Sequence, residues 1–320
     1  MTRGINTGIL QRKALRRNFA FGLLNPFSRL NISVRLGQLA WYILSHWPIK
    51  PLPAKRQSNF RYLTIAGRAH WLMLRESLFS LYRSWRQLPM VSVVSDGSWT
   101  EAEFRSVFAW WPGNIEVLTP AQVVNAVRGE GQEDLAKYAE ASPYGLKLAS
   151  IVQAAHQPLP LLFVDADILW FEDPSLLLGD CQSWAKPKGL RESHCYQRKD
   201  MAMRYCPQVL KPPFVNGGIL ALKGEFLEIE MLREMVQEAL ADPTDGSFEQ
   251  TIIATAVHKG AGLLPEHLCL VDFDDNQDLR QRNMRQEGYF ARHYVNWIRH
   301  LLYRDALKLR FLPSTACGII

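Results

Sequence analysis

The chain has 320 residues, 48% of them hydrophobic and 21% charged, so it can bury a substantial core and is neither a disordered nor a collagen-like sequence. Its length fits one large domain, or one domain with an appendage. Of its 37 basic and 31 acidic residues, 13 basic and no acidic ones lie in residues 1–75, which leaves 24 and 31 for the rest. The basic front predicts an anionic partner, either membrane lipid or nucleic acid.

Residues 1–87 are expected to form a basic helical N-terminal extension. Residues 29–47 (RLNISVRLGQLAWYILSHW) can form an amphipathic helix with aromatic residues near one end. Such a helix can lie among lipid headgroups, or it can pack on the rest of the protein. No nucleic-acid-binding motif accompanies the charge, so we expect no nucleic-acid partner. Three prolines in residues 48–59 (PIKPLPAKRQSN) predict a linker.

The sequence shows no sign of export or of a membrane span. No apolar run with a cleavage site directly follows the basic residues 1–17. The most apolar stretch, residues 36–49, is shorter than the roughly 20 residues that a spanning helix needs. An odd and scattered set of cysteines favours free thiols over disulfides or a zinc site. We therefore expect a cytoplasmic protein, with contact at the inner membrane face as an option; its cysteines are Cys181, Cys195, Cys206, Cys269 and Cys317.

From residue 90 onward, apolar strands and helices alternate. Residues 90–98 (MVSVVSDGS) predict a strand and turn, residues 99–111 a helix, and residues 114–120 a second strand. A helix over 142–155 has Ser142 as its N-cap and Pro143 at its first position. Residues 159–167 (LPLLFVDAD) are apolar without alternation, which suits a strand buried on both faces. This order predicts a parallel α/β sheet.

The order of elements is looser after residue 167. A strand over 213–224 is interrupted by Asn216, Gly217 and Gly218. Helices are expected over 225–240, 247–260 and from residue 296, and a late strand over 266–273.

Two carboxylates mark the predicted ligand-binding edge of the sheet. Asp165 and Asp167 directly follow an apolar strand, and ligands of open α/β sheets bind beyond the carboxyl ends of strands. Two carboxylates one residue apart can hold Mg²⁺ or Mn²⁺ against a diphosphate. The ion would offset the charge that develops on a leaving diphosphate.

An Asp-x-Asp after a buried strand resembles the signature of GT-A fold glycosyltransferases, and the resemblance covers roughly residues 88–300. It implies an α/β fold with a mixed sheet and a Rossmann-like N-terminal half, here as a catalytic domain over residues 88–320. It also implies a nucleoside diphosphate sugar as donor and a divalent metal ion. Carried over, Asp167 would bind the metal, and Asp165 would contact the metal shell or the ribose.

Three further segments are similar to glycogenin-like members of that group. FVNGGILALK would place Asn216 on the sugar, with Gly217 and Gly218 allowing close approach of the ligand, unless they form a bulge in a core strand. Glu249 and Gln250 match an Asp-Gln pair that faces the reacting sugar, with Glu in place of Asp. Glu249 could stabilise the transition state, orient the acceptor, act as base, or be an acid favoured at a helix N-terminus.

The third segment is ARHYVN, in which His293 would complete the metal site and favour Mn²⁺, with His300 as the rival. Asp96 would meet the nucleotide base or ribose, or cap the next helix. Lys147 matches a position near the phosphates, the alternative being a solvated lysine.

The resemblance implies transfer of a hexose-type sugar to a hydroxyl acceptor. Its glycogenin-like features favour retention of configuration at the anomeric carbon. The acceptor would be a carbohydrate or a glycolipid. A sugar nucleotidyltransferase is the first rival, but the loop after residue 95 lacks a Gly-rich, basic sequence. A non-catalytic binding protein of the same fold is the second.

Overall fold

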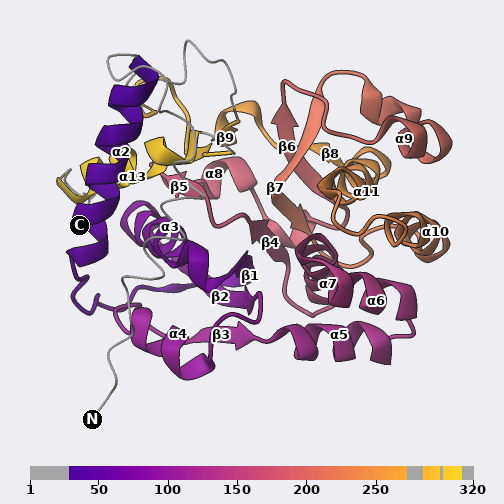
Figure 1. Ribbon diagram of the computed structural model, residues 1–320, viewed down its shortest axis with the longest axis horizontal. Coiled ribbons are helices and arrows are strands. Elements are labelled where there is room, and N and C mark those ends of the chain that lie inside the picture. Colours follow the sequence, from indigo (N-terminus) through magenta and orange to yellow (C-terminus); the bar gives the residue numbers. More distant parts are fainter. Residues whose placement is uncertain (1–28, 272–283, 296–297, 312–320) are drawn as a thin grey trace.

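The computed structural model describes residues 29–271, 284–295 and 298–311 (Figure 1). The main sheet has seven described strands in the order β3-β2-β1-β4-β7-β6-β8. The first four are parallel, and β7 runs antiparallel to both of its neighbours. The strands are β1 (Gln57–Ala66), β2 (Leu88–Ser95), β3 (Ile115–Leu118), β4 (Leu161–Val164), β6 (Lys188–Glu192), β7 (Phe214–Leu222) and β8 (Gly262–Leu263).

Strand β1 is the main difference from the sequence-based expectation. Residues 57–66 were assigned to the linker and the extension, and the sheet was expected to begin at residue 90. Instead β1 pairs in parallel with both β2 and β4 and lies at the centre of the parallel half. Asn59 and Arg61 hide its pattern, because the outer half of β1 is only partly buried. The expected extension therefore contributes a central strand and helix α3 (Trp71–Ser84) to the α/β layers.

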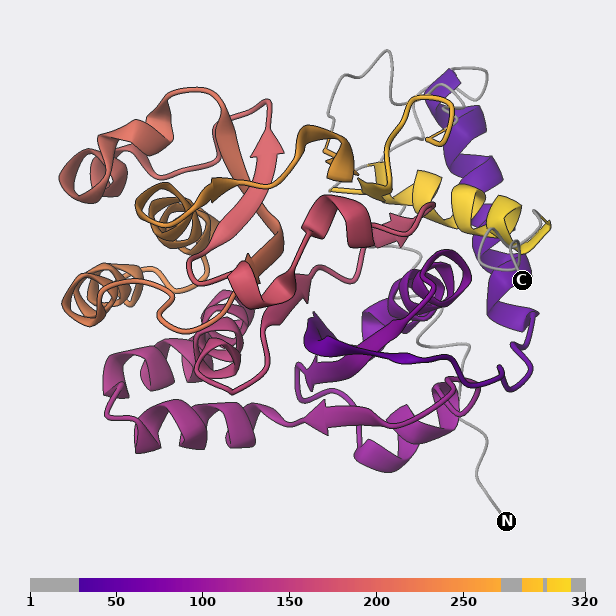
Figure 2. The ribbon, with the colours of Figure 1, turned by 180° about the vertical axis from the view of Figure 1, so that it is seen from behind.

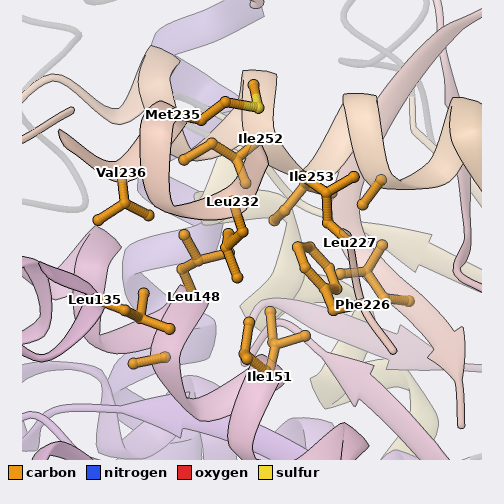
Figure 3. Close-up of a cluster of buried hydrophobic side chains, with 14 of the residues drawn as sticks. Leu135, Leu148, Ile151, Phe226, Leu227, Leu232, Met235, Val236, Ile252 and Ile253 are labelled. Atoms are coloured by element: carbon orange, nitrogen blue, oxygen red, sulfur yellow. The ribbon is translucent and has the colours of Figure 1, made fainter. Parts of the chain in front are cut away.

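Helices cover both faces of the sheet. One face is covered by a cluster of five helices, part of which is shown in Figure 3: α5 (Pro120–Gly129), α6 (Glu133–Ala141), α7 (Pro143–Ala155), α10 (Ile229–Ala239) and α11 (Gly246–Lys259). On the other face, α3 and α4 (Glu101–Val107) pack with an aromatic-rich cluster. Leu161 and Phe163 of β4 point to the first cluster, and Leu162 and Val164 to the second. The prediction of a strand buried on both faces is thus confirmed.

A second sheet of three short strands lies beside the main one, in the order β5-β10-β9. It is formed by β5 (Ile168–Trp170), β9 (Cys269–Leu270) and β10 (Ala291–His293). A third hydrophobic cluster joins this sheet to helices α2 (Arg29–His46) and α13 (Arg299–Phe311). The two helices lie side by side in both ribbon views (Figures 1 and 2).

Several helices begin where a side chain satisfies one of their free amide groups. Thr100 forms a capping box with Glu103, Ser142 accepts from Gly145 N, and Asp245 accepts from Ser247 N. The remaining α-helices with described bounds are α8 (Ser175–Leu178) and α9 (Lys199–Tyr205). None of the described helices is both long and apolar enough to span a bilayer.

Candidate active site

The two aspartates lie where the main sheet passes into the small one. The N–H of Asp165 donates to the carbonyl of Gly218 at 2.8 Å, which extends the pairing of β4 with β7 by one residue. Two residues on, the carbonyl of Asp167 accepts from Tyr294 N at 2.9 Å, beside the pairing of β5 with β10. Backbone pairing on both sides thus fixes the two carboxylates at the end of β4.

His293 is brought to the aspartates by the same pairing. It lies on β10 opposite Ile168, next to Asp167, and its Nε2 is 3.1 Å from Asp167 Oδ1 and 3.7 Å from Asp165 Oδ2. One ligand atom from each of the three residues lies within 4.8 Å of the other two. The three side chains converge although 126 residues separate His293 from Asp167.

Asn216 fixes which nitrogen of His293 faces the carboxylates. Its Oδ1 accepts from Gly218 N at 2.8 Å, and its Nδ2 donates to Glu192 Oε2 at 3.1 Å. The amide orientation is therefore set, and the oxygen that lies 3.1 Å from His293 Nδ1 is an acceptor. It follows that Nδ1 carries the hydrogen. The other nitrogen, Nε2, faces Asp165 and Asp167, where a proton or a metal ion can satisfy all three groups.

A buried lysine links the aspartates to helix α11. Lys147 Nζ lies 3.1 Å from Asp165 Oδ1 and 3.2 Å from Glu249 Oε1. Burial disfavours the ammonium ion, but the two carboxylates outweigh it and raise the pKa of Lys147. Burial also raises the pKa of Glu249, against the pull of Lys147. Glu249 Oε2 accepts from Gln250 Nε2 at 2.8 Å, so the pair on α11 is joined directly.

Arg299, the first residue of α13, holds the second aspartate. Its Nε and Nη2 lie 3.0 and 2.9 Å from Asp167 Oδ2. Burial alone would raise the pKa of Asp167, but Arg299 and His293 together hold that pKa well below its usual range. Asp167 is therefore a carboxylate in the absence of any ion.

These groups line a cavity of about 590 Å³. Two of the ten sequence-predicted residues are not among the lining residues, and both are glycines. A Cβ on Gly218 would lie 2.4 Å from His293 Cε1, and one on Gly217 would lie 2.9 Å from Ile253 Cδ1. The glycines thus admit protein side chains. The eight predicted residues that line the cavity are Asp96, Lys147, Asp165, Asp167, Asn216, Glu249, Gln250 and His293.

Asp96 lies at the β1 edge of the cavity. Its Oδ1 accepts from Ser98 N at 2.9 Å, and a Cβ on Gly67 would fall 1.7 Å from its Oδ2. The rival ligand His300 lies elsewhere, on α13 against α2, where its Nε2 is 3.1 Å from Ser33 Oγ. Its place in that helix contact excludes it from the cluster.

Several cavity residues were not identified from the sequence. Glu192 ends β6, a strand the sequence pattern did not show, and Arg299 was read as part of an ordinary helix. A basic residue soon after His293 at a helix start is the one local signal that could have indicated Arg299. The cavity is also lined by Gly67, His70, Tyr144 and Tyr196. The first two were not identified from the sequence because strand β1 was not predicted.

The residues present fit a divalent metal ion. Two carboxylates and an imidazole are ligands that Mn²⁺ accepts, and the imidazole favours it over Mg²⁺. The orientation of His293 by Asn216 is the support that metal-bound histidines normally have. Among the described lining residues, five carboxylates face only Lys147 and Arg299 as permanent cations, an excess of negative charge that a divalent ion would offset.

A second cavity, of about 620 Å³, lies beside the edge strand β3. Its lining includes Lys55, Arg61 and Glu116, but within the described ranges the Asp165–Asp167–His293 group is the one set that could hold a metal. The two cavities are similar in volume, so volume does not identify the site. The converging side-chain ligand atoms of Asp165, Asp167 and His293 do identify it.

No family model matches the sequence, and neither does any curated protein. Solved structures do. A galactosyltransferase, LgtC, in complex with donor and acceptor sugar analogues shares 13% identity over 80% of this chain and 98% of its own, with a TM-score of 0.51. Mouse xyloside xylosyltransferase 1 (13% identity, 74% and 97% covered, TM-score 0.47) and the bifunctional glycosyltransferase WbbM (10%, 80% and 51%, TM-score 0.49) also match. The similarity to LgtC shows that this chain has the GT-A fold that its Asp-x-Asp strand led us to expect.

Proposed function

We propose that the protein is a metal-dependent glycosyltransferase that moves a sugar, of hexose type, from a nucleoside diphosphate sugar to a hydroxyl acceptor. The observation that carries the proposal is the convergence of Asp165, Asp167 and His293 in a cavity at the carboxyl end of a parallel sheet. The LgtC structure was solved with donor and acceptor sugar analogues, and its fold is similar to this one.

Asp165, Asp167 and His293 would hold Mn²⁺ or Mg²⁺. When bound, such an ion neutralises negative charge on a leaving diphosphate. Arg299 and Lys147 add fixed positive charge on either side of the aspartates. Arg299 would keep Asp167 in place and offer its remaining guanidinium N–H groups to phosphate oxygens.

Glu249 and Gln250 line the cavity next to Lys147, which supports a role for this pair at the sugar. One oxygen of Glu249 faces Lys147 and the other accepts from Gln250. We therefore assign Glu249 to the positioning of these two groups rather than to proton abstraction. The Gln250 amide offers a donor and an acceptor to sugar hydroxyls.

Asp96 is assigned to the nucleoside, because it lines the cavity beside Gly67, directly after β1. The acceptor is proposed to be a saccharide, free or attached to lipid. A cytoplasmic location is part of the proposal, since cytoplasm supplies nucleotide sugars and suits cysteines that are free.

The direct test is release of nucleoside diphosphate from a panel of nucleotide sugars with Mn²⁺ and mixed saccharide acceptors. We expect turnover that a chelator abolishes and that Asp167→Asn removes. Asp173→Asn is the matched control, because Asp173 lies outside the cavity, where it accepts from Arg86 N and Ser175 N. Pyrophosphate release from a nucleoside triphosphate and a sugar phosphate would instead identify a nucleotidyltransferase.

A further inference from the structure

Helix α2 presents an apolar stripe to solvent. Ile32, Leu36, Leu39 and Tyr42 are spaced by four, three and three residues, which places them along one side of a helix. Their exposed fractions are 49, 50, 55 and 60%. Figure 1 shows α2 at the outer edge of the molecule. We call these four residues the α2 face.

The stripe continues past the end of the helix. Trp47 is exposed, and its ring lies 5.5 Å from that of Phe311, which is 70% exposed at the end of α13. Single exposed apolar residues are ordinary on soluble proteins, whereas a contiguous row of them marks an interaction surface.

The α2 face is not needed to hold the helix in place. The opposite side of α2 buries Val34, Ala40, Trp41 and Leu44 in the third hydrophobic cluster or beside it. At Gly37 the helix approaches α13 so closely that a Cβ would lie 2.5 Å from the carbonyl oxygen of His300. An ordinary packed helix has polar residues on its outer side, so the apolar residues there call for another partner.

The charge around the α2 face selects the partner. The helix itself contains no acidic residue, and Arg35 on it and Lys50 soon after it are both exposed. Residues 1–28, which precede it in the sequence, contain five basic residues and no acidic one. A second copy of the chain would bring two such basic fronts together, which like-charge repulsion disfavours. An anionic surface attracts the basic front and can also receive the apolar side chains.

We propose that the α2 face docks the protein on an anionic lipid bilayer. The four side chains of the α2 face enter the boundary between headgroups and acyl chains, Trp47 lies at headgroup depth, and Arg35 and Lys50 contact lipid phosphates. Because the α2 face lies on the side of α2 away from α13, docking leaves the contact between the two helices intact. The proposal goes beyond glycosyl transfer and does not depend on it.

The test is co-sedimentation of the full chain with vesicles, without nucleotide or acceptor. We expect binding to phosphatidylcholine mixed with phosphatidylglycerol, weak binding to phosphatidylcholine alone, and weakening at raised salt. Leu39→Glu with Tyr42→Glu should weaken binding to the mixed vesicles by about tenfold or more, because it removes two inserted side chains and adds two repelled charges. The milder pair Leu39→Ser with Tyr42→Ser should give a smaller loss in the same direction.

The matched control is Leu176→Glu with Met203→Glu. These residues are 92% and 57% exposed on α8 and α9, so the charge change and exposure are comparable but the α2 face is intact. Equal melting temperatures of all variants would show that they fold. Binding that persists in both α2 pairs, equal loss in the control, or no binding to anionic vesicles would each overturn the proposal. So would concentration-dependent dimerisation that the α2 variants abolish, since it would identify a second copy as the occupant.

Discussion

Glu76 and Asp167 are both buried carboxylates held by arginine, and they differ in what surrounds them. Glu76 on α3 is fully buried, with Arg310 Nη2 2.7 and 2.8 Å from its two oxygens and Arg75 Nε at 2.9 Å. Asp167 is held by Arg299 on one oxygen and faces His293 with the other. Both contacts anchor α13, one at each end of the helix.

The Glu76 cluster is closed. Its two oxygens are shared between two arginines, Arg310 lies 3.9 Å from the Phe79 ring centre, and Glu76 lines neither cavity. The Asp167 cluster is open: it lines a cavity, and a second carboxylate, Asp165, approaches the same histidine. A buried carboxylate whose charge is fully paired by arginines has a structural role, whereas several carboxylates around a cavity favour the binding of a cation.

The largest expected effect is the loss of activity when the Asp167 carboxylate is neutralised. Asp167→Asn keeps the size of the side chain but removes one charge from the ligand set. We expect the rate of nucleoside diphosphate release to fall by about a thousandfold, since a metal contributes several kcal/mol of charge stabilisation. Steady-state kinetics would measure this. A variant that keeps full metal-dependent activity would remove Asp167 from the site.

The converse variant is Glu76→Gln. It leaves Arg310 buried against a neutral amide, so we expect unfolding to become easier by about 3 kcal/mol, at the lower end of the cost of breaking a buried ion pair. Urea unfolding followed by circular dichroism would measure this. Activity per folded molecule should stay near that of the wild type. Lost activity in a fully folded Glu76→Gln protein would contradict the assignment of this cluster to stability alone.

Asn216→Ala tests how the orientation of His293 affects metal binding in the Asp167 cluster. It removes the acceptor that orients His293 and leaves Glu192 without its amide partner. We expect Mn²⁺ to bind about tenfold more weakly, with lost activity largely recovered at saturating metal. Titration of activity against Mn²⁺ would separate this from a direct role. A reduced maximal rate with unchanged metal affinity would indicate contact with the sugar instead.

The smallest effect is expected at Ser142, which caps the helix that carries Lys147. Ser142→Ala removes the hydrogen bond to Gly145 N, and we expect a loss of about 1 kcal/mol in unfolding free energy. Thermal unfolding would measure it. Since Lys147 keeps its contacts with Asp165 and Glu249, metal affinity should not change. A large fall in metal affinity would show that the cap positions the site directly.

Local patterns revealed the centre of the site. The unbroken apolar run before Asp165 predicts a strand buried on both faces, and Ser142–Pro143 predicts the start of α7, so both positions could be read from neighbours in the sequence. The choice between His293 and His300 could not, because it depends on the pairing of β10 with β5. The resemblance favoured His293, and the structure places it next to Asp167.

The largest omission has a physical cause as well. Strand β1 follows three prolines and contains Asn59 and Arg61, so it reads as a linker although its second half is buried. Missing β1 concealed the Gly67–His70 edge of the cavity. Glu192 and Arg299 were missed because their roles come from contacts 24 and 132 residues away in the sequence.

We propose above all that Asp165, Asp167 and His293 bind a divalent metal together with a nucleoside diphosphate. Isothermal titration calorimetry of the wild-type protein with a panel of nucleoside diphosphates, with and without Mn²⁺, tests it most directly. We predict that one or more of them binds in the presence of the metal, that binding is much weaker without it, and that Asp167→Asn abolishes the difference while Glu76→Gln retains it. Nucleoside diphosphate binding that does not change with metal or with Asp167→Asn would contradict this assignment of the three residues. So would the absence of any binding to a folded protein.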